Sequence, residues 1–196
     1  MSSVVISGDT SGSLTLTVPA IAGTGTLTLP SGTGTVAVNG VSSNIVSGTA
    51  QNSTSGTSLL FTGVPSWAKR VAVIFNGVSM NNTNQPLVQI GSGSVTSTGY
   101  LSYTSVMDTA VASTSSTAGF IIYSNSSSAL LYGVMMLTNI SGNTWVCSGN
   151  MAIGSTARST VFGGNVTLSG ALDRVNITSV GGTQTFTAGS INIQWE

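Results

Sequence analysis

The residues able to do acid–base, nucleophilic or metal chemistry are few in this chain. Its 196 residues include four acidic residues, one cysteine and no histidine. Without histidine, neither a Ser–His–Asp nor a Cys–His nucleophile can form in its usual arrangement, and zinc sites built on histidine are excluded. The lone Cys147 supplies neither a four-cysteine zinc site nor a disulfide within the chain. The sequence therefore predicts no catalytic, metal-binding or cofactor-binding residues.

The four carboxylates are too scattered to indicate an enzyme. They are Asp9, Asp108, Asp173 and Glu196. A glycosidase needs two carboxylates that converge on one bond, and nothing local brings Asp108 and Asp173 together. The glycine-rich runs lack the lysine and the following helix of a phosphate loop. We expect no enzyme, with a polysaccharide depolymerase as the enzymatic alternative, and we expect Cys147 to be a small buried hydrophobe.

The charge content excludes further classes. Charged residues make up 4% of the chain and the net charge is zero, against about 25% charged residues in ordinary globular proteins. Four basic residues cannot form a phosphate-binding stripe, so no nucleic acid is expected as a partner. The longest apolar stretch, 129–137, is too short to span a membrane as a helix, and the first residues lack a signal-peptide pattern, so neither membrane insertion nor export is expected.

A surface with so little charge favours association. We expect a subunit whose neighbours cover much of its surface, and the alternative is a monomer coated with serine and threonine. Helical periodicity is nearly absent, whereas period-two runs bounded by Gly, Asn and Ser occur throughout.

Every aromatic residue lies beyond residue 56, so the hydrophobic core is expected in 57–196. The predicted strands there are 57–62, 69–76, 86–91, 98–104, 118–124, 129–138, 144–153, 158–169, 172–179, 183–187 and 190–195. Their number and spacing predict an all-β fold, a jelly-roll-like β-sandwich.

The first 46 residues differ in character. Three similar segments, 11–20, 23–32 and 32–41, alternate Thr or Ser with Leu or Val and end at turn signals. They hold too few large side chains to bury a core alone, which is typical of units that stack or pair with other chains. The sequence predicts an extended β arm or trimeric stalk over 1–46, used for attachment, then a linker over 47–56 and the sandwich. The alternative for the arm is a flexible tail. The residues expected at the attachment or trimer interface are Leu14, Leu16, Val18, Leu27, Leu29, Val36 and Val38.

Two pairs of adjacent charges open predicted strands and are candidate interface charges. Lys69 and Arg70 precede the apolar run 71–75, where they either contact an anionic partner surface or keep a strand edge soluble. Asp173 and Arg174 precede 175–179. They form either a buried ion pair that fixes register at a subunit contact, or a rim pair of little energetic weight.

Three aromatic residues are candidates for contact with a glycan. Trp67, Tyr100 and Tyr103, if exposed together, can stack on sugar rings while nearby hydroxyl and amide groups bind the sugar hydroxyls. The alternative for all three is packing in the core.

Several blocks of the sequence resemble a known class of proteins. TSLLFTGVPSWAKRVAVIFNGVS (57–79), the IGSG turn (90–93) and TGYLSYTS (98–105) look like a module of tailed-bacteriophage fibre and virion-surface proteins. SGALDRVNITSVGGTQTFTAGSINIQWE (169–196) resembles the end of that module, and 14–38 resembles segments that precede it. The resemblance implies a homotrimeric virion structural protein, assembled in the bacterial cytoplasm. Its implied partners are itself and other virion proteins, above all the major capsid protein.

Two functions are compatible with this resemblance. A chain of 196 residues with no extended shaft and no coiled coil suits a capsid decoration or head fibre anchored by its N-terminal β arm. The alternative is a receptor-binding tail-fibre tip that recognises a glycan of the host cell surface. The absence of histidine excludes the histidine-bound iron sites of some fibre tips. No catalytic residue is carried over from the resemblance.

Overall fold

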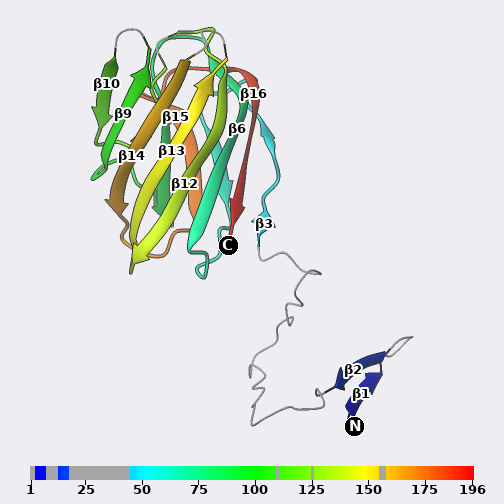
Figure 1. Ribbon diagram of the computed structural model, residues 1–196. Helices are drawn as coiled ribbons and strands as arrows, with labels where there is room; N and C mark the ends of the chain where they lie inside the picture. Colours follow the sequence, from blue (N-terminus) through cyan, green and yellow to red (C-terminus); the bar gives the residue numbers. More distant parts are fainter. Residues whose placement is uncertain (1–2, 8–12, 18–44, 109–110, 125, 155–157) are drawn as a thin grey trace. The chain divides into compact units, whose positions relative to one another are not determined.

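The computed structural model describes residues 3–7, 13–17, 45–108, 111–124, 126–154 and 158–196. The chain divides into two compact units, Met1–Val41 and Ser42–Glu196. Every regular element in the described residues is a β-strand, and all strand pairs are antiparallel (Figure 1). The prediction of an all-β fold is thus confirmed.

The strands are numbered in chain order. In the first unit they are β1 (Ser3–Ser7) and β2 (Ser13–Thr17). In the second unit they are β3 (Val46–Ser47), β4 (Gln51–Asn52), β5 (Leu59–Thr62), β6 (Arg70–Met80), β7 (Pro86–Ser92), β8 (Ser94–Val95), β9 (Leu101–Met107), β10 (Ala112–Ser116), β11 (Phe120–Ile121), β12 (Leu131–Ser141), β13 (Thr144–Ile153), β14 (Arg158–Thr167), β15 (Arg174–Ser179) and β16 (Phe186–Trp195).

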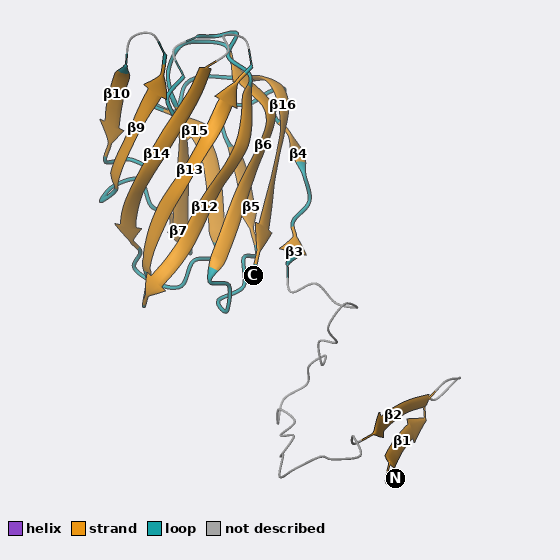
Figure 2. Cartoon of the chain, in the orientation of Figure 1, coloured by secondary structure: helices purple, strands orange, loops and turns teal. Residues whose placement is uncertain are grey.

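The second unit is a sandwich of two sheets. The large sheet has the order β10-β9-β14-β13-β12-β6-β16-β3, with β4 also paired to β16. The small sheet has the order β11-β7-β15-β5, with β8 paired to β7. Eight of these strands form the series β4-β16-β6-β12 facing β5-β15-β7-β11. The chain crosses between the two series at every step except from β7 to β11, which is jelly-roll connectivity. In Figure 2 the large sheet stands in front of β5 and β7.

Four of the remaining strands, β9, β10, β13 and β14, enlarge the large sheet. β13 and β14 lie between β12 and β15 in the chain, and β9 and β10 lie between β7 and β11. Both insertions extend the large sheet beyond β12. The large sheet is therefore wider than an eight-stranded jelly roll requires.

One hydrophobic core fills the space between the sheets. Alternation along each strand directs every second side chain inward, as for Val71, Val73 and Phe75 of β6, each at most 2% exposed. Val175 and Ile177 of β15 face them from the small sheet and are fully buried. Packing between these inward faces holds the two sheets together.

Hydroxyl groups join the inserted strands to the small sheet. Ser102 and Thr104 point inward from β9 and are 2% exposed. The Ser102 hydroxyl accepts a hydrogen bond from the Ile121 N–H at 2.9 Å, and the Thr104 hydroxyl accepts one from the Tyr123 N–H at 3.2 Å. These bonds satisfy backbone donors beside β11 that no neighbouring strand pairs, as buried donors require.

The first unit contains a β-hairpin. β1 and β2 pair in register, with Val4 opposite Leu16 and Ile6 opposite Leu14. Two of the predicted interface residues, Leu14 and Leu16, thus lie in β2. The others, Val18, Leu27, Leu29, Val36 and Val38, lie outside the described residues.

The structure differs from the predicted strands in three places. The segments 183–187 and 190–195 are one strand, β16, with register shifts on both sides of Ala188. β10, with the sequence ASTSS, was not predicted, because it has no large apolar side chain to produce a period-two signal. The predicted linker 47–56 runs beside β16 and contributes to β3 and β4, which are too short to show periodicity.

Candidate assembly surface

The outward side chains of β9, β14, β13, β12, β6 and β16 form what we call the outer face. Alternation places these residues opposite the buried ones of the same strands. Its apolar members are Ala72, Ile74, Leu101, Tyr103, Met107, Tyr132, Val134, Met136, Val146, Ala152 and Val161. Of the thirteen exposed large hydrophobic side chains in the described residues, six are among these, and a seventh, Ile140, is exposed at the irregular end of β12.

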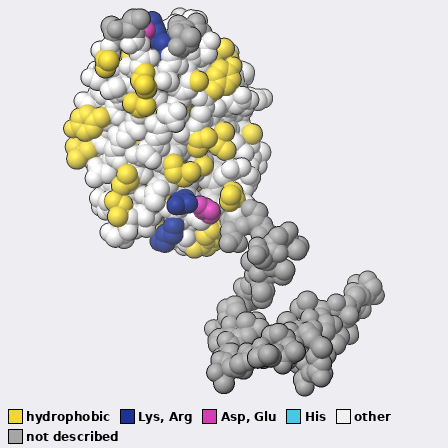
Figure 3. All heavy atoms as spheres, in the orientation of Figure 1, with side chains coloured by type: hydrophobic (Ala, Val, Ile, Leu, Met, Phe, Trp, Pro, Cys, Tyr) yellow, Lys and Arg dark blue, Asp and Glu magenta, His cyan; other side chains and the backbone are white. Residues whose placement is uncertain are grey.

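The central strands of the outer face are apolar on both sides. In β6, Ala72 and Ile74 alternate with the buried Val71, Val73 and Phe75. A strand with apolar residues on both faces is typical of a sheet covered on both faces. No element in the described part of the chain pairs with this side, and Figure 3 shows it open.

The apolar residues of neighbouring strands meet in rows. Ala72 of β6 lies opposite Met136 of β12, and Ile74 lies opposite Val134. Val134 is 40% exposed. Other outward residues carry hydroxyl and amide groups, such as Asn150 of β13. The outer face therefore combines apolar side chains with neutral hydrogen-bonding groups.

Charges lie only at the two ends of this face. At one end Arg70 Nη1 is 3.0 Å from Glu196 Oε1, and their side chains are 60% and 40% exposed. At the opposite end Arg158 Nε is 2.7 Å from Asp108 Oδ2. Between the two pairs, no described residue of the outer face is charged, as Figure 3 shows.

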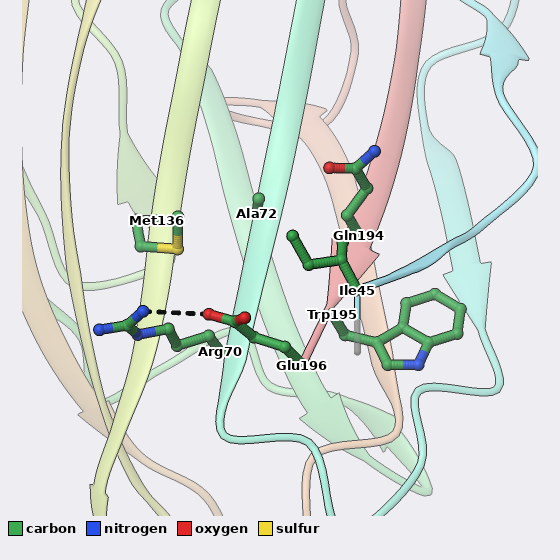
Figure 4. Close-up of a pocket in the computed structure, with 7 residues that line it drawn as sticks. All are labelled: Ile45, Arg70, Ala72, Met136, Gln194, Trp195 and Glu196. Atoms are coloured by element: carbon green, nitrogen blue, oxygen red, sulfur yellow. Dashed lines mark hydrogen bonds and ion pairs between the residues drawn. The ribbon is translucent and has the colours of Figure 1, made fainter. Parts of the chain in front are cut away.

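A hollow of about 110 Å³ lies on the outer face, beside Arg70 and Glu196 (Figure 4). Ile45, Ala72 and Met136 supply apolar walls, and the Arg70–Glu196 ion pair closes one side. Ile45 is the residue before β3, so the hollow lies at the first described residue of the sandwich.

The candidate interface charges are held within the chain. The Lys69 ammonium donates to Asn139 Oδ1 at 3.4 Å, and Arg70 pairs with Glu196. Asp173 Oδ1 accepts from Arg174 Nε at 2.7 Å, and their side chains are 40% and 22% exposed. Within one chain this is a partly exposed pair, which contributes little to stability.

Asp173 also holds a turn. Its carboxylate accepts from the Gly93 N–H, which lies between β7 and β8, at 3.1 and 3.2 Å. The hydrogen bond from Arg174 lowers the pKa of Asp173, and the Gly93 N–H acts in the same direction. The carboxylate therefore remains ionised down to unusually low pH.

The three candidate glycan contacts do not form one platform. Tyr100 is 1% exposed and its ring meets Phe120 edge-on at 5.0 Å, so its predicted contact with a glycan is wrong. Its hydroxyl is needed inside the core, where the Ile90 N–H donates to it at 2.8 Å. Trp67 and Tyr103 are 56% and 64% exposed. Trp67 precedes β6, whereas Tyr103 is in β9, four strand spacings or about 19 Å away.

Cys147 is 2% exposed on the inner side of β13, which confirms its expected place in the core. Burial raises the pKa of its thiol, so the thiolate does not form near neutral pH. In the described residues no three Cys, Asp or Glu side chains gather as metal ligands would. No helix in those residues is long and apolar enough to cross a membrane.

Sequence analysis missed the outer face as a site, although a signal for it was present. The runs VAVIF (71–75) and VMML (134–137) are apolar without alternation, which indicates strands covered on both sides. Comparison with protein-family models, with curated proteins and with solved structures finds no match for this chain.

Proposed function

We propose that this protein is a structural, self-associating component of a bacteriophage virion, a homotrimeric capsid decoration or head fibre without enzymatic activity. The observation that carries the self-association is the outer face, which exposes six large hydrophobic side chains among neutral polar groups on the single chain (Figure 3). Exposed apolar side chains that share one uncharged face suit a protein–protein interface. Burial in an assembly removes it from water and stabilises the complex.

The virion assignment rests on the resemblance of blocks 57–79, 90–93, 98–105 and 169–196 to virion-surface modules. Placement on the capsid, with attachment by the arm and contact with the major capsid protein, is part of the same proposal. The low content of charged residues, 4%, agrees with a structural subunit that functions by packing against other subunits rather than by catalysis.

Assembly is favoured over glycan recognition at a fibre tip by the aromatic residues. Stacking on a sugar needs aromatic rings that share one surface. With Tyr100 in the core, Trp67 and Tyr103 remain on separate parts of the sandwich. We therefore propose assembly of copies, with the sandwich displayed at the particle surface.

The mass of the protein in solution tests the self-association. We expect analytical ultracentrifugation of the full chain to give about three times the chain mass of 19.6 kDa at micromolar concentration. A species that stays monomeric up to the highest soluble concentration would contradict the proposal. Labelled antibody against the purified protein then tests the location, with labelling on capsids expected and labelling only on tails contradicting it.

A further inference from the structure

We propose that the outer face is the surface through which copies of this chain meet, centred on Ala72, Ile74, Val134 and Met136 of β6 and β12. This inference rests on the proposed self-association and names the surface that carries it. The partner is a second copy of this chain.

The first argument is that β6 and β12 are built as strands covered on both sides. Their inner residues pack against the small sheet, and the middle of their outer side is apolar as well, with Ala72 and Ile74 in β6 and Val134 and Met136 in β12. Val134, at the centre of the face, is 40% exposed on the single chain, and it lies opposite Ile74. A second layer on this side would bury the row, as parallel sheets bury both faces of their strands.

The second argument is the chemistry of the partner. A nucleic acid or an anionic surface requires basic residues, and the described outer face has none between Arg70 and Arg158. A neutral apolar face with amide and hydroxyl groups matches a surface of the same composition. Another copy of the chain, with 4% charged residues, supplies such a surface.

The third argument is size. Six strands about 4.8 Å apart and about 24 Å of strand length give the outer face a planar area of about 600 Å². Side chains roughen the surface, so its accessible area is larger than this planar value. A stable protein interface buries about 800 Å² on each partner. One outer face is thus of the size that a specific contact between copies needs.

The fourth argument is continuity with the first strands of the sandwich. Ile45, the residue before β3, lines the hollow on the outer face together with Ala72 and Met136 (Figure 4). The outer face therefore extends from β6 and β12 to the start of β3.

Cysteine protection tests this surface, because the natural Cys147 is buried and does not react in the folded chain. Val134→Cys places one thiol at the centre of the outer face. Leu60→Cys is the matched control, since Leu60 is 44% exposed and lies on β5 of the small sheet. We expect maleimide to label Val134→Cys at least tenfold more slowly in the assembled protein than after dilution to monomer. The Leu60→Cys rate is expected to be the same in both states.

A charge at the same position gives an independent readout. Val134→Lys leaves the monomer folded, because the side chain is exposed there, but buries an unpaired ammonium between copies. Such a charge costs several kcal/mol, so we expect the dissociation constant to rise about 100-fold or more. Leu60→Lys is expected to keep the wild-type mass, and circular dichroism checks the fold of both variants.

The outcomes separate this inference from the proposed function. A wild-type assembly whose Val134→Cys thiol reacts as fast as in the monomer, and whose mass survives Val134→Lys, would overturn the outer face as the contact and leave self-association standing. A wild-type chain that is always monomeric would overturn both.

Discussion

At the residue scale, Tyr100 shows how a side chain suited to ligand binding is used for the fold. Its hydroxyl accepts from the Ile90 N–H at 2.8 Å and lies 3.1 Å from the carbonyl oxygens of Ile90 and Thr96. Burial raises its pKa to about 12. The hydroxyl thus satisfies backbone groups in the core at Ile90, where β7 is paired with β15 but no longer with β11.

Replacing Tyr100 by Phe tests this role. The ring still fills the core, but the Ile90 N–H loses its acceptor, so we expect Tyr100→Phe to lower the free energy of unfolding by about 1–3 kcal/mol. Tyr103→Phe, at a side chain that is 64% exposed, is the control and should change it by less than about 0.5 kcal/mol. Urea denaturation measures both, and equal stability of the two variants would contradict the role of the hydroxyl.

The raised pKa of Tyr100 also predicts a pH dependence. Below about pH 10 the phenol is protonated in both the folded and the unfolded chain. Above that pH the unfolded chain loses the proton, whereas the folded chain keeps it until about pH 12, so stability falls as pH rises through this window. We expect Tyr100→Phe to show a smaller loss of stability between pH 10 and 12 than wild type does, measured by urea titration at each pH.

At the element scale, a bulge lets β16 run as one strand along β6. Gly189 has a φ of +91°, and a Cβ there would lie 2.4 Å from the carbonyl oxygen of Gly77, which itself has a φ of +66°. The register shifts on both sides of Ala188 occur at this point. Two glycines on facing strands thus allow the close approach that the bulge requires.

Gly189→Ala should disrupt that approach. Both the positive φ and the contact with Gly77 oppose a side chain, so we expect a loss of about 2 kcal/mol or more in the free energy of unfolding. Gly163→Ala on β14 is the control, because the nearest atom to its added Cβ is 3.6 Å away. Thermal melting compares the two, and a Gly189→Ala protein as stable as Gly163→Ala would show that the bulge tolerates a side chain.

The elements also show what the sequence could and could not reveal. The prediction for 144–153 matches β13 residue for residue, because Trp145, Cys147, Met151 and Ile153 keep the two-residue period of a strand on its buried side. Two separate strands were predicted where the structure has β16, because the Gly-Ser sequence at the Gly189 bulge has the composition of a turn. The sheet order depends on contacts between residues far apart in the chain, which local patterns do not encode.

The residues of the candidate site were likewise visible in the sequence only in part. The aromatic residues were visible in the sequence, but whether each faces the core depends on its position in a strand, and Tyr100 lies one residue before β9. The outer face was harder to recognise. An apolar run with no alternation indicates a strand that is covered on both sides, but it does not reveal which element or partner covers the second side.

At the scale of the whole molecule, the separation of charged ends from an uncharged face predicts how association responds to salt. An interface made by the candidate charges Lys69, Arg70, Asp173 and Arg174 would weaken as ions screen them. An interface centred on Ile74 and Val134 of the outer face contains no charged residue, because the charged pairs lie at the two ends of the face. We expect the association constant to change by less than about threefold between 50 and 500 mM sodium chloride, measured by sedimentation equilibrium. A tenfold or greater loss would assign the contact to the charged residues instead.

The pairing of β3 with the end of β16 has a consequence for protein engineering. Val46 lies opposite Trp195, so the chain enters and leaves the sandwich at neighbouring points. Domains whose ends are adjacent tolerate circular permutation and transplantation into loops of other proteins. The sandwich can thus be inserted as a cassette into a surface turn of a host protein, carrying its broad uncharged face with it.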